Sequence, residues 1–159
     1  MNQEGYISLG DVISHGSNPV ENHCVEFVRT NVKHSIRGDH DAPPAQGKIR
    51  PENLKYLSGL PDYLLLGNVL LIHSSLKMPG RHLWKEEHLR EEQKYIARLF
   101  PHVDYVFFGH THHKEVFSHS SCRKMLDGGK RHFRRLGFPL FLSPGALAAG
   151  IRPRERSFL

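Results

Sequence analysis

The stretch that decides the fold is Val103-Asp-Tyr-Val-Phe-Phe-Gly-His-Thr-His112. Its apolar first part predicts a buried strand over residues 103–108, and the strand stops at a glycine that is followed by two histidines. Glycine lets the backbone turn tightly, so that the next side chains point across the end of the sheet. Open α/β sheets bind their ligands in loops of this kind. The stretch therefore predicts an α/β fold with a ligand site at the carboxyl ends of its strands.

The same arrangement occurs three more times. An apolar strand is followed, directly or after a small residue, by a side chain that can bind a metal ion. Taken singly, a Gly-Asp pair is usually a turn, and a histidine after an apolar run is usually a core residue. Four such segments in one chain argue against coincidence. Imidazole and carboxylate together suit Mn, Fe, Zn or Co better than Ca. The segments are Gly10-Asp11, Gly38-Asp39-His40-Asp41, Ile72-His73 and Gly109-His110-Thr111-His112.

A helix is predicted between the first two strands, which span residues 6–9 and 34–37. Asn18 is a good N-cap, Pro19 fits the first helical position, and Glu21 can reach back to the cap. A strand–helix–strand unit of this kind favours a right-handed parallel crossover. Apolar side chains recur at helical spacing up to about residue 30, which predicts a buried stripe formed by Val20, Cys24, Phe27 and Val28.

The rest of the chain alternates short elements. Residues 54–60 predict a short helix before a proline, and residues 63–66 and 69–72 predict a hairpin joined at Gly67-Asn68. The strongest helical pattern covers residues 84–100. Its predicted apolar side consists of Leu89, Ile96, Leu99 and Phe100.

The chain has 159 residues, of which 38% are hydrophobic and 24% are charged, and this suits one ordinary globular domain. No run reaches the roughly 18–20 apolar residues of a membrane span, and the N-terminus does not resemble a secretory signal. Cys24 and Cys122 are far apart and form no disulfide framework, which favours a reducing cytoplasm.

The net charge of +6 indicates an anionic partner, such as a small phosphate ester or a nucleotide. Arg123, Arg131 and Arg134 lie in a basic segment and are predicted to bind the distal anion of the substrate, although a solvated hairpin face explains the segment equally well. The sequence argues against nucleic acid as the partner, because it has no aromatic-rich RNA motif, helix-turn-helix or zinc finger.

In this order the motifs resemble those of the calcineurin-like metallophosphoesterase superfamily, in its compact bacterial and archaeal branch. The resemblance runs from about Tyr6 to the end, and His73 stands where the family has a lone strand-end histidine. It implies a β-sandwich flanked by helices, in a four-layer αββα order. The matching motifs are Gly10-Asp11 with Gly16 for G-D-x-x-x-x-G, Gly38-Asp39-His40-Asp41 for G-N-H-D/E, Gly109-His110-Thr111-His112 for G-H-x-H, and Ser143-Pro144-Gly145-Ala146 for N-P-G-S.

The resemblance implies two divalent metal ions drawn from Mn, Fe, Zn or Co, with Mn favoured. Asp11 is expected to bridge both ions. Asp39, His73 and His110 complete the shell of the second ion, and His112 serves the first. Two cations that share a water lower its pKa, and they neutralise the oxygens of a phosphoryl group.

The implied reaction is hydrolysis of a phosphomonoester, a phosphodiester or a nucleotide. His40 is expected near the leaving-group oxygen, where it donates a proton or stabilises charge. Asp41 is expected to orient His40, with turn capping as the alternative role. The alternative function is a catalytically weak or inactive relative that serves as a binding or scaffold protein. The four surviving ligand segments argue against it.

The sequence also departs from the family pattern. The family opens with a strand that ends in D-x-H, and no such motif precedes Tyr6. The expectation is a single domain over residues 1–159 that lacks the first strand and is truncated at both ends. Asp39 stands where asparagine is usual in the family.

Overall fold

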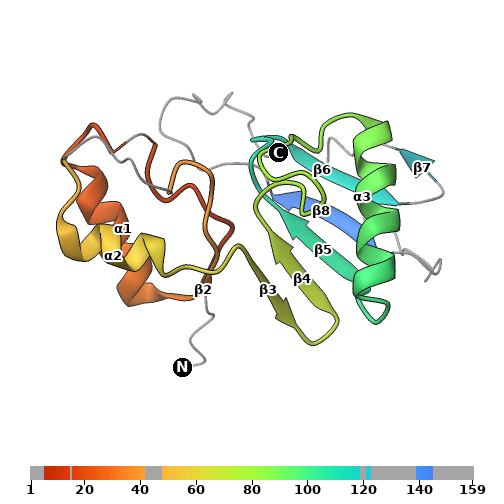
Figure 1. The fold of residues 1–159 in the computed structure, drawn as a ribbon, viewed down its shortest axis with the longest axis horizontal. Coiled ribbons are helices and arrows are strands. Elements are labelled where there is room, and N and C mark those ends of the chain that lie inside the picture. The colour runs from red at the N-terminus through yellow and green to blue at the C-terminus, as the bar shows by residue number, and fades with distance from the viewer. Residues whose placement is uncertain (1–5, 15, 42–47, 119–120, 123–138, 145–159) are drawn as a thin grey trace, which may run out of the picture.

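The computed structural model describes residues 6–14, 16–41, 48–118, 121–122 and 139–144. Across these residues, α1 and α2 lie together on one side of a small sheet. A larger sheet lies on the other side of the small sheet, and α3 covers the outer face of the larger sheet (Figure 1). This helix–sheet–sheet–helix order confirms the predicted α/β fold. The elements are β1 (Tyr6–Ser8), α1 (Glu21–Asn31), β2 (Val32–Ser35), α2 (Pro51–Ser58), β3 (Tyr63–Leu66), β4 (Val69–Ile72), α3 (Glu86–Leu99), β5 (Tyr105–Phe108), β6 (Lys114–Ser118), β7 (Ser121–Cys122) and β8 (Leu140–Pro144).

The small sheet consists of β1 and β2, which pair in parallel as predicted, with Ser8 opposite Ser35. Beyond the paired residues, the backbone N–H of Ile36 donates to the carbonyl of Ser8 at 3.2 Å. Both strands therefore run toward the same edge, and the loops that follow them leave the sheet side by side.

Helix α1 buries a different face from the one predicted. Val20 and Phe27 are 59% and 55% exposed, and Cys24 is also exposed, whereas Asn22 and Val25 are buried. The physical reason is the Asn22 amide, which holds the chain that leads into α2. Its Nδ2 donates to the carbonyl of Lys48 at 2.9 Å, and its Oδ1 accepts from the Arg50 N–H at 2.8 Å. The predicted apolar stripe is therefore wrong at Val20, Cys24 and Phe27. The buried face instead carries Asn22 with its hydrogen bonds and Val25, which packs against Ile13, Ile49 and Leu57.

The start of α1 also serves the loop after β1. Asn18 Oδ1 accepts from the Val20 N–H at 3.0 Å, and the helix begins at Glu21. The Glu21 carboxylate does not close a capping box with this asparagine. It accepts instead from the backbone N–H groups of Ser14 and Gly16, at 3.1 and 3.0 Å. The helix thus fixes the loop that carries Asp11.

The larger sheet has the strand order β3-β4-β5-β8-β6-β7 within the described residues. The predicted hairpin at Gly67-Asn68 is confirmed, since β3 and β4 pair antiparallel. Strands β4 and β5 pair in parallel, with Ile72 opposite Phe108. The residues just beyond these strands therefore lie together, and the Gly109 N–H donates to the His73 carbonyl at 3.1 Å.

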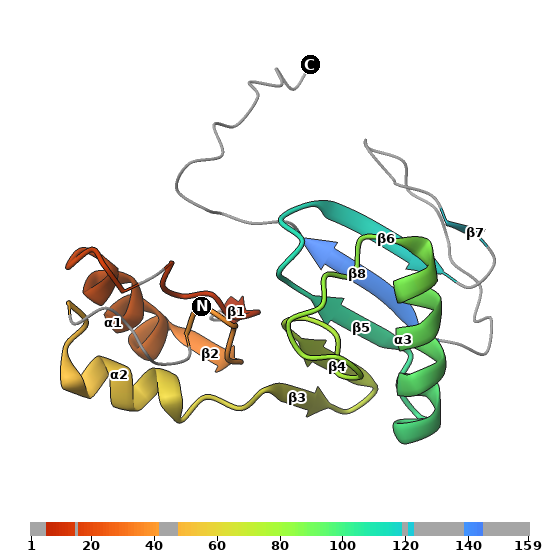
Figure 2. The same ribbon diagram turned by 45° about the horizontal axis from the view of Figure 1, so that its top comes forward.

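Helix α3 packs on one face of the larger sheet (Figure 2). Leu89 and Ile96 enter a core with residues of the strands, among them Leu70, Val106, Phe108 and Phe141. Leu99 is 51% exposed, so its predicted place on the buried side is wrong. Gln93 takes part in the buried face, because its side-chain amide donates to the carbonyl of Pro139 at 2.9 Å.

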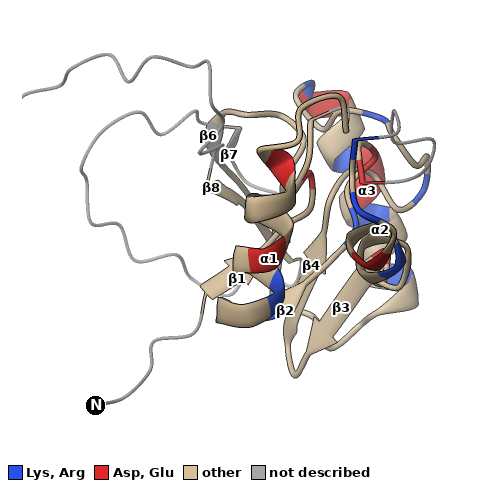
Figure 3. Ribbon diagram, turned by 90° about the vertical axis from the view of Figure 1, so that its left-hand side faces the viewer, with Lys and Arg blue, Asp and Glu red and all other residues tan. Residues whose placement is uncertain are grey.

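The surfaces of α2 and α3 carry acidic and basic side chains together (Figure 3). Glu86 and Arg90, for example, form an ion pair across one turn of α3. Among the described helices, none combines the length and the apolarity that a membrane crossing requires.

Candidate metal centre

Four of the predicted ligands meet at one point. Asp11, Asp39, His73 and His110 each offer one ligand atom, and these atoms lie within 4.8 Å of one another. The four residues follow β1, β2, β4 and β5, so the two sheets contribute two residues each. We call Asp11, Asp39, His73 and His110 the acid–histidine cluster.

Glycines allow the loops of the cluster to touch. A Cβ atom on Gly38 would lie 2.1 Å from Asp11 Oδ1 and 2.2 Å from the Asp11 backbone nitrogen. Gly10 has a φ of +91°, and a Cβ atom on it would lie 2.5 Å from the backbone nitrogen of Gly38. Any side chain at these two positions would push the loops apart. The glycines that precede the ligands are therefore required by the close approach of two backbones.

The two cluster histidines are oriented in the same manner. His73 Nδ1 donates to the Leu9 carbonyl at 2.6 Å, and His110 Nε2 donates to the Gly80 carbonyl at 3.2 Å. Their other ring nitrogens face the same carboxylate oxygen, Asp39 Oδ1, at 2.8 Å for His73 and 2.9 Å for His110. Metal-binding imidazoles are commonly held by a second hydrogen bond of this type, which fixes the ring and its tautomer.

The carboxylate oxygens of the cluster lie close to its imidazole nitrogens, so a positive charge between these atoms is stabilised. Burial disfavours the charged form of His73, but the hydrogen bond and the charge of Asp11 outweigh it and raise the pKa of His73 to about 9. Burial likewise opposes ionisation of Asp11, yet the contacts with His73 prevail and lower the pKa of Asp11. A divalent cation satisfies the same atoms in place of the proton, and two carboxylates with two imidazoles suit Mn, Fe, Zn or Co. The residues present therefore fit a divalent metal ion.

We expect metal uptake to compete with this proton. Between pH 7 and about 9, the affinity for Mn²⁺ should rise by about tenfold per pH unit, because His73 must lose its proton before it can bind the ion. Isothermal titration calorimetry at pH 7.5, in two buffers of different ionisation enthalpy, should show release of about one proton. An affinity that does not change over this pH range would contradict the role of His73.

The stability of the metal-free protein should fall as the pH rises, whereas the metal affinity should increase. The pKa of His73 lies near 9 in the folded protein, against the ordinary 6.5 in the unfolded chain. The stability that its protonation contributes is therefore complete below pH 6.5 and is lost as the pH rises through 9. The melting temperature in EDTA should fall accordingly between pH 7 and pH 10.

His40 lies at the edge of the cluster. Its backbone N–H donates to Asp11 Oδ1 at 3.1 Å, and its ring Nδ1 donates to the Ser14 carbonyl. The ring Nε2 lies 3.7 Å from Asp39 Oδ2, and the side chain is 35% exposed. This placement gives the ring contact both with the cluster and with solvent.

Asp41 holds the two loops together. Its carboxylate accepts from the Ile13 N–H at 3.1 Å and from the Gly38 N–H at 2.9 Å, and the residue is only 1% exposed. Burial raises the pKa of Asp41, and the hydrogen bonds from Gly38 and Ile13 offset part of that rise. These contacts match the turn-capping role, the alternative predicted for Asp41. They also hold together the two loops that carry Asp11 and Asp39.

One predicted ligand lies apart from the cluster. His112 is exposed, with a φ of 58°, and it falls outside the cluster. The predicted substrate-binding residues Arg123, Arg131 and Arg134 lie outside the described residues. The hydroxyl of Ser143 lies 3.3 Å from that of Thr111, which ties the end of β8 to the loop of His110.

Two residues beside the cluster escaped the sequence analysis. The ring of His82 stacks on His110, with centroids 3.8 Å apart, and Trp84 stacks on His82 at 4.3 Å. Burial and the nearby charge of His110 lower the pKa of His82. The periodicity predicts a helix over residues 84–100 that includes Trp84, but α3 begins at Glu86. The alternation of two rings in His82-Leu83-Trp84 was the available signal.

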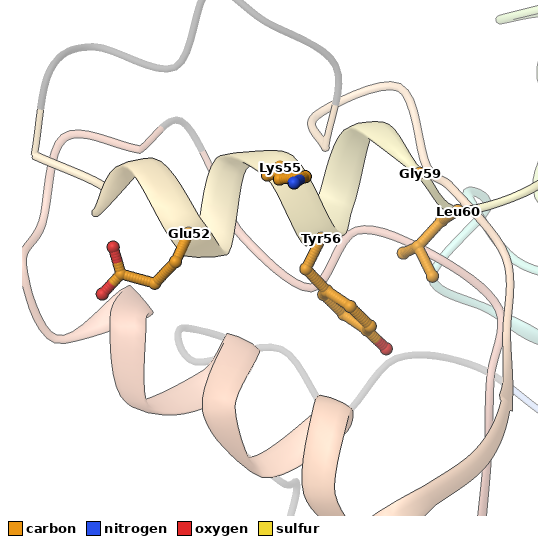
Figure 4. Close-up of a pocket in the computed structure, with 5 residues that line it drawn as sticks. All are labelled: Glu52, Lys55, Tyr56, Gly59 and Leu60. Carbon is orange, nitrogen blue, oxygen red and sulfur yellow. The ribbon is translucent and has the colours of Figure 1, made fainter.

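A separate shallow pocket lies on the surface of α2 (Figure 4). Its lining contains none of the predicted ligands: it consists of Glu52, Lys55, Tyr56, Gly59 and Leu60. Among the described residues, the group that could hold a metal ion is the acid–histidine cluster and not this pocket.

Comparison with known proteins gives a consistent result. The calcineurin-like phosphoesterase family model matches residues 2–114. Among solved structures, a metallophosphoesterase from Sphaerobacter thermophilus is similar, with a TM-score of 0.67 and 23% sequence identity. The match covers 90% of this chain and 66% of that one, so this chain spans somewhat less than two thirds of the solved relative. At this identity the likeness shows the fold. No protein in a comparison with curated sequences matches the chain.

Proposed function

Because the chain belongs to the calcineurin-like phosphoesterase family, we propose that it is a metal-dependent hydrolase of phosphomonoesters, phosphodiesters or nucleotides. The observation that carries the proposal is the convergence of Asp11, Asp39, His73 and His110 from four separate strand ends. In this proposal, residues 1–159 act as one phosphoesterase domain.

The cluster would hold one divalent cation, and Mn²⁺ is the favoured ion. Asp11 and His112 would hold a second ion. A bound cation would supply positive charge for the phosphoryl oxygens and would lower the pKa of a water, so that hydroxide is available as the nucleophile. Asp11 and Asp39 contribute negative charge that retains the cation. The backbone hydrogen bonds of His73 and His110 keep their other ring nitrogens beside the Asp39 carboxylate, where they would bind the cation.

His40 is proposed as the proton donor to the leaving group. The hydrogen bond from its Nδ1 to Ser14 leaves Nε2 on the side of the cluster, where a protonated ring can give its proton to an ester oxygen. Asp41 acts indirectly in this proposal, since it fixes the loops that carry His40 and Asp11.

The proposal is tested by removing and restoring the metal. After treatment with EDTA, the protein should not hydrolyse p-nitrophenyl phosphate or bis(p-nitrophenyl) phosphate, and added Mn²⁺ should restore turnover. Which of the two esters is cleaved will separate a phosphomonoesterase from a phosphodiesterase. If Mn²⁺ gives no turnover above the EDTA-treated sample, the proposed function is wrong.

The role of His40 predicts an effect that depends on the leaving group. His40→Asn should lower kcat for phenyl phosphate by about 100-fold, because the phenolate leaves poorly without a proton. The loss for p-nitrophenyl phosphate should be much smaller, since p-nitrophenolate leaves readily as an anion. Equal losses for both esters would show that His40 positions the site and does not donate a proton.

A further inference from the structure

The segment between β4 and α3 builds a column of rings that ends on the acid–histidine cluster. His82 lies between His110 on one face and Trp84 on the other, with interplanar angles of 23° and 11°. Trp84 is the only tryptophan of the chain, and it is 52% exposed. Both faces of His82 are thus occupied, and among the described residues the column ends at the half-exposed indole of Trp84.

This segment is firmly attached to α3. The carboxylate of Glu92, a residue that is 1% exposed, accepts from the Leu76 N–H at 2.7 Å. Arg81 forms an ion pair with Glu91 at 3.0 Å. Leu83, which separates His82 from Trp84 in the sequence, is 1% exposed and belongs to the core of the larger sheet. The exposed position of Trp84 is therefore set by the contacts that the residues before it make with α3 and with the core.

We propose that Trp84 is a stacking platform for the base of a nucleotide whose phosphate binds at the acid–histidine cluster. This inference rests on the proposed function, because it assumes that the cluster receives a phosphate. An indole presents a large flat apolar face, and a flat base fits this face better than an aliphatic alcohol does. The platform would give the site a preference for nucleotides over small aliphatic phosphate esters.

Stacking of a base on an aromatic side chain contributes about 1–3 kcal/mol. An affinity difference of about tenfold corresponds to 1.4 kcal/mol, so a loss of about tenfold is the expected effect of removing the indole.

The first test uses the fluorescence of Trp84 itself. The protein is loaded with Zn²⁺, since paramagnetic Mn²⁺ would quench the signal, and is mixed with AMP or ribose 5-phosphate in a stopped-flow instrument before turnover. AMP should quench the fluorescence and bind about tenfold more tightly than ribose 5-phosphate, which carries the same phosphate without a base. Equal affinities for the two compounds, or no quenching by AMP, would overturn the proposal.

The second test compares two substitutions of Trp84. Trp84→Phe should keep AMP affinity within about threefold, whereas Trp84→Leu should lose about tenfold for AMP and leave ribose 5-phosphate binding unchanged. Calorimetric titration measures both, and thermal unfolding checks that the variants are folded. An equal loss for the two ligands in Trp84→Leu would mean that the residue only supports the cluster, which contradicts the proposal.

The two proposals can fail separately. If AMP is preferred through Trp84 but no phosphate ester is hydrolysed, the base platform is correct and the hydrolase function is wrong. If esters are hydrolysed with Mn²⁺ and the base makes no difference, the hydrolase function is correct and the platform is wrong.

Discussion

His73→Ala is expected to lower Mn²⁺-dependent turnover of p-nitrophenyl phosphate by about a thousandfold or more. The imidazole is a proposed ligand whose Nε2 lies 2.8 Å from Asp39 and 3.3 Å from Asp11, and it is 5% exposed. Its loss leaves two carboxylates facing each other without the charge that balances them. Each 1.36 kcal/mol of lost transition-state stabilisation costs a factor of ten, and a metal ion contributes several kcal/mol.

The matched control is His102→Ala, which makes the same exchange at an exposed position before β5 and outside the cluster. It should keep turnover and Mn²⁺ affinity within about twofold of the unchanged protein, as surface substitutions generally do. Circular dichroism must show that both variants are folded. If His73→Ala retains Mn²⁺-dependent turnover comparable to that of His102→Ala, the assignment of His73 as a ligand is refuted.

Gly38→Ala is expected to destabilise the fold strongly and to weaken metal binding at the same time. The added Cβ would meet Asp11 Oδ1 at 2.1 Å and the Asp11 backbone nitrogen at 2.2 Å, so the loop that carries Asp11 must move. We expect a loss of about 3 kcal/mol, which lowers the melting temperature by about 10 °C in a chain of this size. Thermal unfolding and calorimetric titration with Mn²⁺ measure the two effects.

Gly59→Ala provides the comparison for this substitution. Gly59 follows α2 with a φ of −83°, and its added Cβ would meet nothing closer than 3.4 Å. Its melting temperature and metal affinity should stay near those of the unchanged protein. A Gly38→Ala variant as stable as Gly59→Ala would show that the two loops do not approach each other as described.

The sequence predicted the strands of the site well because the signals were local. An apolar run that ends in glycine and a polar side chain identifies a strand end, as at Gly10-Asp11 and Gly109-His110. Parallel pairing then brings such ends to one edge, which is how β4 and β5 place His73 and His110 together. The convergence of four ligands followed from these two rules, together with the family resemblance.

The sequence could not predict features that depend on the path of a loop. Asn22 outcompetes the apolar stripe of α1 because Lys48 and Arg50 lie within reach of its amide. His82 and Trp84 lie beside the cluster because α3 holds the preceding loop through Glu91 and Glu92. Such contacts link residues far apart in the chain, so a local pattern such as His82-Leu83-Trp84 does not reveal which residues its rings contact.

The most direct measurement is an anomalous difference map from crystals grown with Zn²⁺ and recorded at the zinc absorption edge. We predict a peak at about 2.0–2.2 Å from one oxygen each of Asp11 and Asp39 and one ring nitrogen each of His73 and His110. A crystal saturated with Zn²⁺ in which no peak lies among these four side chains would contradict the account.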